Sequence, residues 1–386
     1  MSSTVYDYAI VGAGAAGLQL ALAMKADSFF RTKRVLIIDK SAKTENDKTW
    51  CYWEAGGGPY DHLLTHSWAS GLFYTKTQET FLQLAPYRYK MLRSIDFYSY
   101  AIEELNAATF MEWRQEEVVT ILQKEEIEIQ TLENRYQARH VFDSRIENDF
   151  FKSKDSSLRL LQHFRGWYIK TAKDFFDPTK FVMMDFRLRW KDSTSFTYVL
   201  PTSSTTALVE FTLFSPALLK EEEYQQLLKK YVEEILQPGE YFIQDREAGV
   251  IPMTDYPFHK SHSPLLTKIG TAGGWVKPSS GYSFKNGYRF SKQIVKNLKA
   301  GRNPSFQIAV SRFRMYDALL LDILVNKNHL GPSIFADMYA KNNPALIFSF
   351  LDEQTNWKQD VSIIRKFNWP PFMKALVAYP FRKLLG

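Results

Sequence analysis

Residues 8–17 read Tyr-Ala-Ile-Val-Gly-Ala-Gly-Ala-Ala-Gly, a short apolar run that leads into a glycine-rich turn. Gly12, Gly14 and Gly17 form the pattern G-x-G-x-x-G, with a helix rich in Ala, Leu and Met predicted at 18–26. The first glycine permits the tight turn, the second lets the backbone approach a pyrophosphate, and the third packs the helix against the strand. The stretch predicts a phosphate site at a helix N-terminus.

A second strand and a carboxylate complete this pattern. The β-branched run 35–38 is typical of a strand buried in a parallel sheet, and Asp39 follows it, 39 − 17 = 22 residues after the last glycine. A carboxylate there accepts hydrogen bonds from a ribose hydroxyl. The motif fits FAD and NAD equally well. Its place near the start of the chain favours FAD, by analogy with flavoproteins that have two dinucleotide-binding domains.

The bulk composition is that of a globular protein. The 386 residues are 45% apolar and 24% charged, which is enough for two or three domains. Aromatic residues reach 15% and suit either an ordinary core or a cavity for a long apolar or cationic molecule. Cys51 is the single cysteine, so an internal disulfide is excluded and no metal site is expected. We therefore expect a cytoplasmic protein.

The net charge of +7 fits an anionic partner, either nucleic acid or lipid head groups. Lys and Arg are dispersed along the chain without a zinc or helix-turn-helix pattern, so no nucleic-acid partner is expected. No apolar run approaches the roughly 20 residues that a spanning helix needs. The first ten residues also lack the pattern of a signal peptide.

Along the chain, the periodicity changes from strand–helix–strand to short alternating strands and then to helices. We predict an α/β fold with an FAD-binding Rossmann-type parallel sheet, an inserted antiparallel-sheet substrate domain and a helical C-terminal region. Residues 249–287 are dense in Gly, Pro and Ser and are expected to form loops. The predicted FAD-binding domain comprises 1–60, 96–150 and 245–300; the substrate-binding domain comprises 61–95 and 151–244, and the helical region comprises 301–386.

An ordered set of further segments resembles the lycopene cyclase family of FAD enzymes. The matches run from residue 7 to about 287, roughly three quarters of the chain, whereas the last hundred residues carry no matching motif. The segments are Asn46–Trp53 with its Trp-x-x-Trp ending, Tyr89–Phe97, Val141–Arg145, Gln162–Trp167, Met184–Arg187, Val209–Phe214, Gly249–Met253 and Gly270–Tyr282.

The resemblance implies a redox-neutral reaction that requires reduced FAD, with NAD(P)H as the reductant. Lycopene, or a related acyclic carotenoid, would be cyclised by a lycopene β-cyclase, an isomerase (intramolecular lyase) that forms β-carotene through γ-carotene. Glu210 stands in the family's glutamate-bearing motif and is the candidate acid, because burial in its apolar strand would raise its pKa. The alternative is a solvent-facing Glu210. Gly270, Gly273 and Gly274 would let the backbone approach the flavin or its pyrophosphate.

Other flavoproteins remain competitors. Hydroxylating monooxygenases usually carry Asp-Gly where this chain has Asp143-Ser144, and Gly-Asp where it has Gly270-Thr271. Flavin-dependent halogenases carry Trp-x-Trp-x-Ile-Pro, which is missing here. Another prenyl-lipid flavoenzyme, such as a geranylgeranyl reductase-like oxidoreductase, is the nearest alternative. The sequence leaves open β- against ε-ring closure, one ring against two, and the oligomeric state.

The last 18 residues, 369–386, combine apolar and aromatic side chains with Lys374, Arg382 and Lys383 and no acid. Such a segment is typical of a peripheral membrane contact, with rings at the acyl boundary and cations at anionic head groups. The alternative is a C-terminal helix packed on the core. Removal of the segment should weaken liposome binding in the first case and unfold the protein in the second.

Overall fold

The computed structural model describes residues 5–147, 150–151, 155–308 and 312–384. The chain divides into two compact units, each assembled from three separate segments. The first unit comprises Met1–Asn46, Ser94–Asp155 and Tyr256–Ser311, and the second comprises Asp47–Arg93, Ser156–Asp255 and Arg312–Gly386. The predicted domain limits stay a prediction, because these units are defined by contacts alone and end at other residues.

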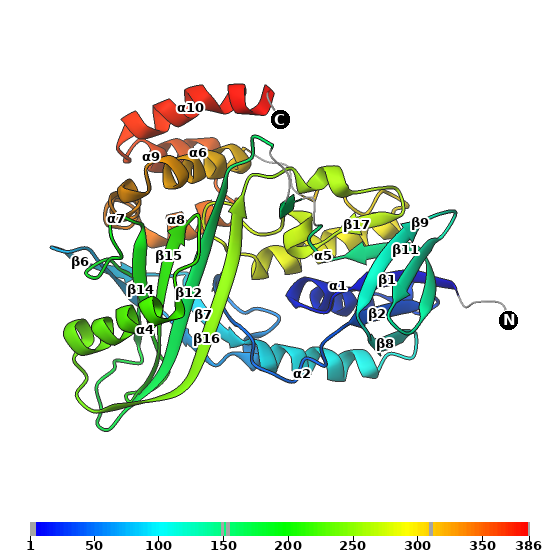
Figure 1. The fold of residues 1–386 in the computed structure, drawn as a ribbon, viewed down its shortest axis with the longest axis horizontal. Helices are drawn as coiled ribbons and strands as arrows, with labels where there is room; N and C mark the ends of the chain where they lie inside the picture. Colours follow the sequence, from blue (N-terminus) through cyan, green and yellow to red (C-terminus); the bar gives the residue numbers. More distant parts are fainter. Residues whose placement is uncertain (1–4, 148–149, 152–154, 309–311, 385–386) are drawn as a thin grey trace. The chain divides into compact units, whose positions relative to one another are not determined.

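The first unit is built on a mixed sheet in the order β8-β2-β1-β11-β10-β9, with β17 also paired to β11 (Figure 1). Strands β8, β2, β1, β11 and β17 run parallel, whereas β9, β10 and β11 form an antiparallel meander. The elements are β1 (Val5–Val11), α1 (Ala15–Lys25), β2 (Val35–Asp39), α2 (Ser94–Asn106), β8 (Met111–Gln115), β9 (Val118–Gln123), β10 (Ile127–Thr131), β11 (Arg135–Asp143), β17 (Leu266–Lys268) and α5 (Phe284–Lys299).

The second unit contains a seven-stranded sheet, β16-β12-β15-β14-β13-β5-β6, and a three-stranded sheet, β3-β7-β4. Both sheets are antiparallel except where β13 runs parallel to β5. Their strands are β3 (Thr49–Ala55), β4 (His66–Trp68), β5 (Ser70–Tyr74), β6 (Glu79–Gln83), β7 (Tyr87–Arg93), β12 (Arg159–Thr171), β13 (Lys180–Asp185), β14 (Ser195–Pro201), β15 (Thr206–Ser215) and β16 (Tyr241–Thr254).

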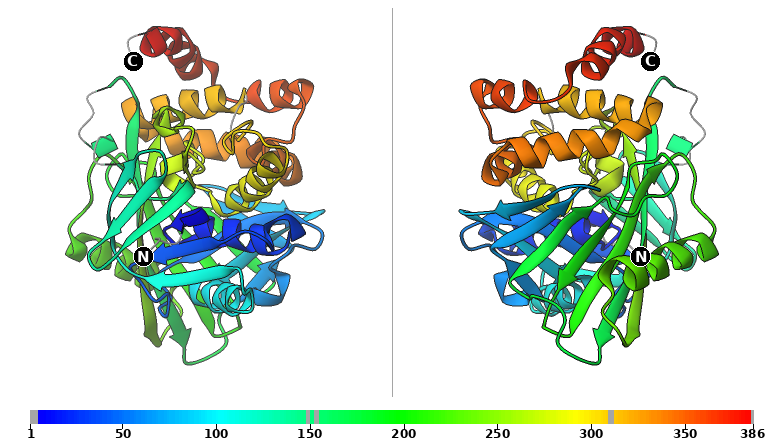
Figure 2. Two further views of the ribbon diagram at one scale, coloured as in Figure 1. Left: turned by 90° about the vertical axis from the view of Figure 1, so that its right-hand side faces the viewer. Right: turned by 90° about the vertical axis from the view of Figure 1, so that its left-hand side faces the viewer.

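Helices complete the second unit. The amphipathic helix α4 (Glu221–Lys230) continues as a π-helical turn, and the later helices lie together beside the strands of this unit (Figure 2). They are α6 (Phe313–Asn326), α7 (Gly331–Lys341), α8 (Pro344–Leu351), α9 (Trp357–Ile364) and α10 (Trp369–Leu384). Within the described ranges, no helix is long and apolar enough to cross a membrane.

Strand β15 presents different residues to the two faces of the large sheet. Val209, Phe211 and Leu213 pack in one core cluster with Tyr224 and Leu228 of α4. Since side chains alternate along a strand, the even-numbered residues of β15 point to the opposite face. Phe214 on that face contacts Phe335 of α7, so helices cover both faces of this strand.

The predicted fold class is confirmed: a parallel-rich sheet, antiparallel sheets and C-terminal helices are all present. The prediction of loops throughout 249–287 is wrong. Strand β16 continues to Thr254, β17 occupies Leu266–Lys268, and α5 begins at Phe284. Residues 241–254 form a long strand because they pair along almost the whole of β12, a partner that local composition does not reveal.

Candidate active site

The glycine-rich turn joins β1 to α1 at the carboxyl ends of the parallel strands. Gly12 adopts a left-handed backbone with φ of +93°, and a Cβ there would lie 1.9 Å from the Ser144 Oγ. A Cβ on Gly17 would lie 2.0 Å from the Gly12 carbonyl oxygen. These two glycines are therefore fixed by the fold of the turn itself, as the spacing predicts.

Gly14 differs from both, because no atom lies within 4 Å of where its Cβ would be. It is the N-cap of α1, it provides no side-chain cap, and the first turn of the helix contains no acidic residue. The first amides of a helix have no partner within the helix and carry partial positive charge. Open space beside Gly14 and these amides together form a site that suits a phosphate group.

Asp39 lies at the end of β2, beside the turn. Its Oδ2 accepts a hydrogen bond from the Ala13 backbone at 2.6 Å, and its Oδ1 accepts one from the Ser41 backbone at 2.8 Å. Lys43 lies 3.1 Å from the same Oδ1. The carboxylate thus holds the turn in place. Each oxygen has two lone pairs, so a ribose hydroxyl can still donate to Asp39.

The second predicted glycine group follows β17 and lies at the same edge of the sheet. Gly270 and Gly274 have φ of +60° and +70°, and a Cβ on Gly270 would lie 3.1 Å from the Ala16 Cβ. A Cβ on Gly273 would lie 2.5 Å from the Lys268 carbonyl oxygen. The structure therefore brings together two glycine groups that are more than 250 residues apart in sequence.

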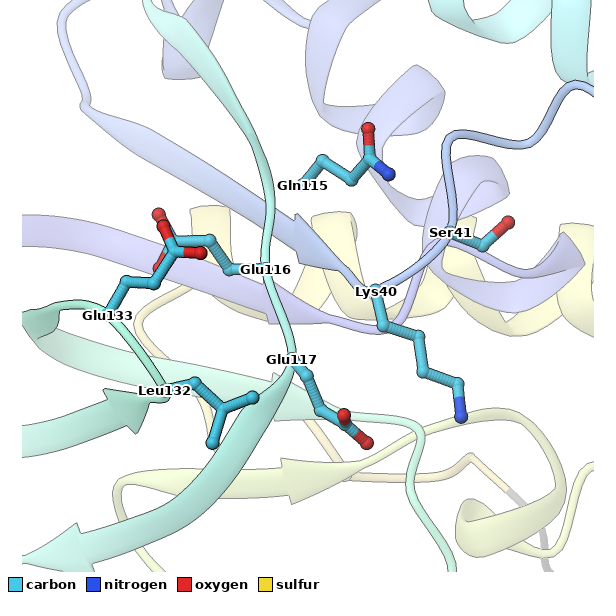
Figure 3. Close-up of a pocket in the computed structure, with 7 residues that line it drawn as sticks. All are labelled: Lys40, Ser41, Gln115, Glu116, Glu117, Leu132 and Glu133. Atoms are coloured by element: carbon cyan, nitrogen blue, oxygen red, sulfur yellow. The ribbon is translucent and has the colours of Figure 1, made fainter.

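A hollow of about 440 Å³ begins at the residue after Asp39 (Figure 3). The ends of two neighbouring parallel strands, β2 and β8, and the turn between β10 and β11 line it. Its volume is in the range of small-molecule sites. The lining residues are Lys40, Ser41, Gln115, Glu116, Glu117, Leu132 and Glu133.

Three buried polar atoms of the first unit have no hydrogen-bond partner among the described residues: Gln19 Oε1, Trp275 Nε1 and Ser280 Oγ. Gln19 belongs to α1, and the other two follow the Gly270–Gly274 turn. Buried polar atoms are normally paired, so their presence around two glycine turns indicates a place where a polar ligand binds.

The candidate acid lies in the second unit, in a row of residues that crosses three strands. Glu210 of β15 is directly opposite Gly166 of β12, and Gly166 is directly opposite Glu247 of β16. Residues in one row point to the same face, so both carboxyl groups flank a residue without a side chain. A Cβ on Gly166 would lie 2.9 Å from the Glu247 Cγ and 3.6 Å from the Glu210 Cβ.

Glu210 is partly buried, on the face of the sheet opposite α4. Burial raises the pKa of Glu210 well above its ordinary value, and the charge of Glu247 and a hydrogen bond between the two carboxyl groups raise it further. A hydrogen bond that Thr212 donates to Oε1 at 2.8 Å acts in the opposite direction. The arrangement favours a protonated Glu210.

Glu247 was not among the residues that sequence reasoning selected. Burial raises its pKa as well, but its Oε2 accepts hydrogen bonds from Thr49 at 2.6 Å and from Tyr168 at 3.3 Å, which lower it. The available signal was its place two residues before the motif Gly249–Met253. Its proximity to Glu210 follows from strand register, which this signal does not contain.

The other buried polar residues form structural networks. Asp143 binds Arg145 and Lys268 at 2.9 Å each. Asp185 pairs with Arg187 and accepts a hydrogen bond from Tyr231 at 2.7 Å. Among the described residues, no group of three potential ligands is placed to hold a metal ion.

The residue pattern and the site agree with one protein family. A family model described as "Lycopene cyclase protein" matches residues 7–376. The chain belongs to the lycopene cyclase family. The match extends beyond residue 287, where the motifs ended, and so includes the C-terminal helices. A search of curated proteins finds no match.

Solved structures share the fold of this lycopene cyclase family member at low sequence identity. One is a geranylgeranyl bacteriochlorophyll reductase-like protein from Thermoplasma acidophilum, with 12% identity, a TM-score of 0.61, and coverage of 99% of this chain and 100% of that one. The flavin-dependent brominase Bmp2 has 14% identity, a TM-score of 0.57 and coverage of 98% and 100%. Halogenase PltM, solved with FAD in one case, has 11% identity, a TM-score of 0.60 and coverage of 90% and 82%.

Proposed function

We propose that this protein is a lycopene β-cyclase, which closes the ψ-ends of lycopene to β-rings by acid catalysis with reduced FAD. Family membership supports the substrate class. The observation that carries the reaction type is Glu210, a carboxyl group whose pKa is raised well above its ordinary value by burial and by a second carboxyl group. A neutral carboxylic acid near pH 7 is what proton donation to a double bond requires.

The proposed reaction moves protons and leaves the oxidation state unchanged. Glu210 transfers its proton to the terminal double bond, which leaves a carbocation on the neighbouring carbon. The next double bond attacks this cation and forms the ring carbon–carbon bond. Loss of a ring proton to a base then restores neutrality, so that the product is an isomer of the substrate.

The residues of the first unit fit FAD. Gly14 and the first amides of α1 would hold the pyrophosphate, and Asp39 would bind the ribose. The hollow beside Asp39 would take the adenine, and the turn at Gly270–Gly274 would approach the flavin. When bound in reduced form, the cofactor supplies negative charge that stabilises a carbocation. NAD(P)H is the proposed source of the electrons that reduce it.

We propose an anionic lipid bilayer as the surface from which the substrate is taken. Exposed apolar side chains recur on one side of α10, at Trp369, Met373, Leu376 and Val377, while Ala375 is buried in a cluster with α6. The helix thus packs on the protein along one face, and its other face is apolar and exposed. Trp357 and Val361 of α9 are exposed as well.

The charges near this face are complementary to anionic head groups. Residues 357–384 contain one acidic residue, Asp360, which is buried and paired with Arg312 at 2.6 Å. Lys358, Arg365 and Lys374 are exposed. Leu385 and Gly386 of the predicted membrane segment lie outside the described residues. Exposed apolar residues beside cations favour a bilayer over a protein partner.

The test of the proposed function is Glu210→Gln, which keeps the shape of the side chain and removes its proton. Expressed in a lycopene-accumulating host, the wild type should yield cyclic carotenoid, and the variant should leave mostly lycopene while it still purifies with FAD. A hundredfold loss of rate would correspond to about 2.7 kcal/mol of barrier. Near-normal ring formation by the variant would overturn the assignment of Glu210 as the acid.

A further inference from the structure

Two buried carboxyl groups on neighbours of one strand are an unusual arrangement. Adjacent strands lie about 4.8 Å apart, so residues on either side of a middle strand are separated by roughly 10 Å of sheet. A side chain on the middle residue normally fills the space between them. Here the middle residue is Gly166, and the carboxyl groups of Glu210 and Glu247 reach each other across it.

We infer that Glu210 and Glu247 form a carboxyl pair that shares one proton, with Glu247 as the ionised member, and that Gly166 is the positioning residue that permits the pair. The inference rests on the proposed function for what the proton is used for. The pair itself is defined by strand register and by the space above Gly166, which nothing else in the row occupies.

Hydroxyl groups decide which member keeps the proton. Thr49 and Tyr168 both donate to Oε2 of Glu247, at 2.6 and 3.3 Å, and the Thr49 and Tyr168 hydroxyls are themselves 2.6 Å apart. Glu210 receives one hydroxyl donor, Thr212. Hydrogen bonds to the charged form of a carboxyl stabilise that form. Glu247 is therefore the better carboxylate, and its charge keeps the proton on Glu210.

Other ionisable groups around the pair do not supply a competing charge. Cys51 of β3 is close enough for both carboxyl groups to raise its pKa, so the thiol is neutral. Arg93 of β7 lies over the Tyr168 ring, 6.0 Å from its centroid. Asp245 precedes Glu247 on β16, is exposed, and adds to the negative charge that raises the pKa of Glu247. The shared proton thus belongs to Glu210 and Glu247 alone.

Infrared spectroscopy of the full chain tests the pair without substrate. Ordinary carboxyl groups are ionised at pH 7, since their pKa values lie near 4, so a protonated carboxyl C=O band at that pH reports an abnormal group. The wild type should show such a band, and Glu210→Gln should remove it. In Glu247→Gln the charge that retains the proton is lost, so the band should titrate away about one pH unit or more below its wild-type midpoint.

Two further variants make the result specific. Gly166→Ala places a methyl group 2.9 Å from the Glu247 Cγ and from the Leu208 Cδ1, so it should separate the carboxyl groups and lower the midpoint in the same direction. Asp245→Asn is the matched control, because it removes an exposed carboxylate from the same strand and should leave the midpoint within a few tenths of a unit. If Gly166→Ala fails to fold, Glu247→Gln alone decides the question.

Activity provides a second measurement. Because protonated Glu210 is the active form, cyclisation should fall as pH rises through its pKa, and Glu247→Gln should move that fall to lower pH. A band and a pH profile that are unchanged in Glu247→Gln would overturn the pair and leave Glu247 a structural residue. Normal ring formation by Glu210→Gln with the band behaving as predicted would contradict the proposed function and leave the pair intact.

Discussion

At the scale of single residues, Gly14 and Gly17 have very different surroundings although they belong to one turn. A Cβ on Gly17 would meet the Gly12 carbonyl oxygen at 2.0 Å, whereas a Cβ on Gly14 would meet nothing within 4 Å. One glycine is required by the fold, and the other faces open space. Substitutions at the two positions should therefore have separable effects.

We predict that Gly14→Val folds normally and loses FAD, because its side chain would occupy the proposed pyrophosphate position. The flavin absorbance of the purified protein measures the loss, and circular dichroism measures the fold. Gly17→Ala is the contrasting variant and should lose thermal stability as well as flavin. Stoichiometric FAD in Gly14→Val would contradict the assignment of the turn.

The residue scale also shows what a sequence pattern can identify. Gly12, Gly14, Gly17 and Asp39 were found from their spacing, since one strand–turn–helix unit places them all. Glu210 was found by resemblance, and the alternation of β15 explains why it does not face solvent. Glu247 was missed, because its partner lies two strands away and no local pattern encodes that register.

At the scale of elements, α10 has two apolar faces with different surroundings. The buried face packs on α6 through Ala375, with Phe372 and Tyr379 beside it, which agrees with the packed-helix alternative. The exposed face is the one proposed to bind lipid. Truncation would remove both faces at once, so substitutions confined to the exposed face give a sharper experiment than removal of 369–386.

We predict that the double variant Met373→Glu, Val377→Glu keeps its FAD and its thermal stability but sediments several-fold less with anionic liposomes. The two side chains are 46% and 63% exposed, so the change adds negative charge without disturbing the packed face. Phe242→Glu, at a side chain 59% exposed on β16, is the control and should bind liposomes like the wild type. Equal sedimentation of all three proteins would rule out this face as the membrane contact.

Element boundaries follow from the same balance of local and distant causes. The helix predicted at 18–26 begins at Ala15, where the glycine turn ends, and the charged amphipathic stretch at 221–236 forms α4 and its π-helical turn. Both are encoded by local spacing of apolar residues. Strand β16 was missed beyond residue 249, because glycine and proline in its sequence concealed a strand that its neighbour β12 stabilises.

At the scale of the whole molecule, each unit is assembled from three separate segments of chain. In the second unit, β5 pairs in parallel with β13, more than 100 residues later. Such pairings depend on the total burial they achieve and leave little trace in either strand. The fold class could therefore be predicted from the sequence, whereas the complete list of strand neighbours could not.

The central claim is that the whole protein isomerises its substrate by moving protons, with no net reduction. The most direct measurement is the mass spectrum of the carotenoid formed from lycopene in D₂O by the full chain with FAD and limiting NAD(P)H. The proton that Glu210 delivers exchanges with solvent, so each ring formed should carry a single deuterium in place of hydrogen and no further added mass. A product that gains two hydrogens for each double bond lost, with NAD(P)H consumed in equal amount, would contradict the cyclase and identify a reductase instead.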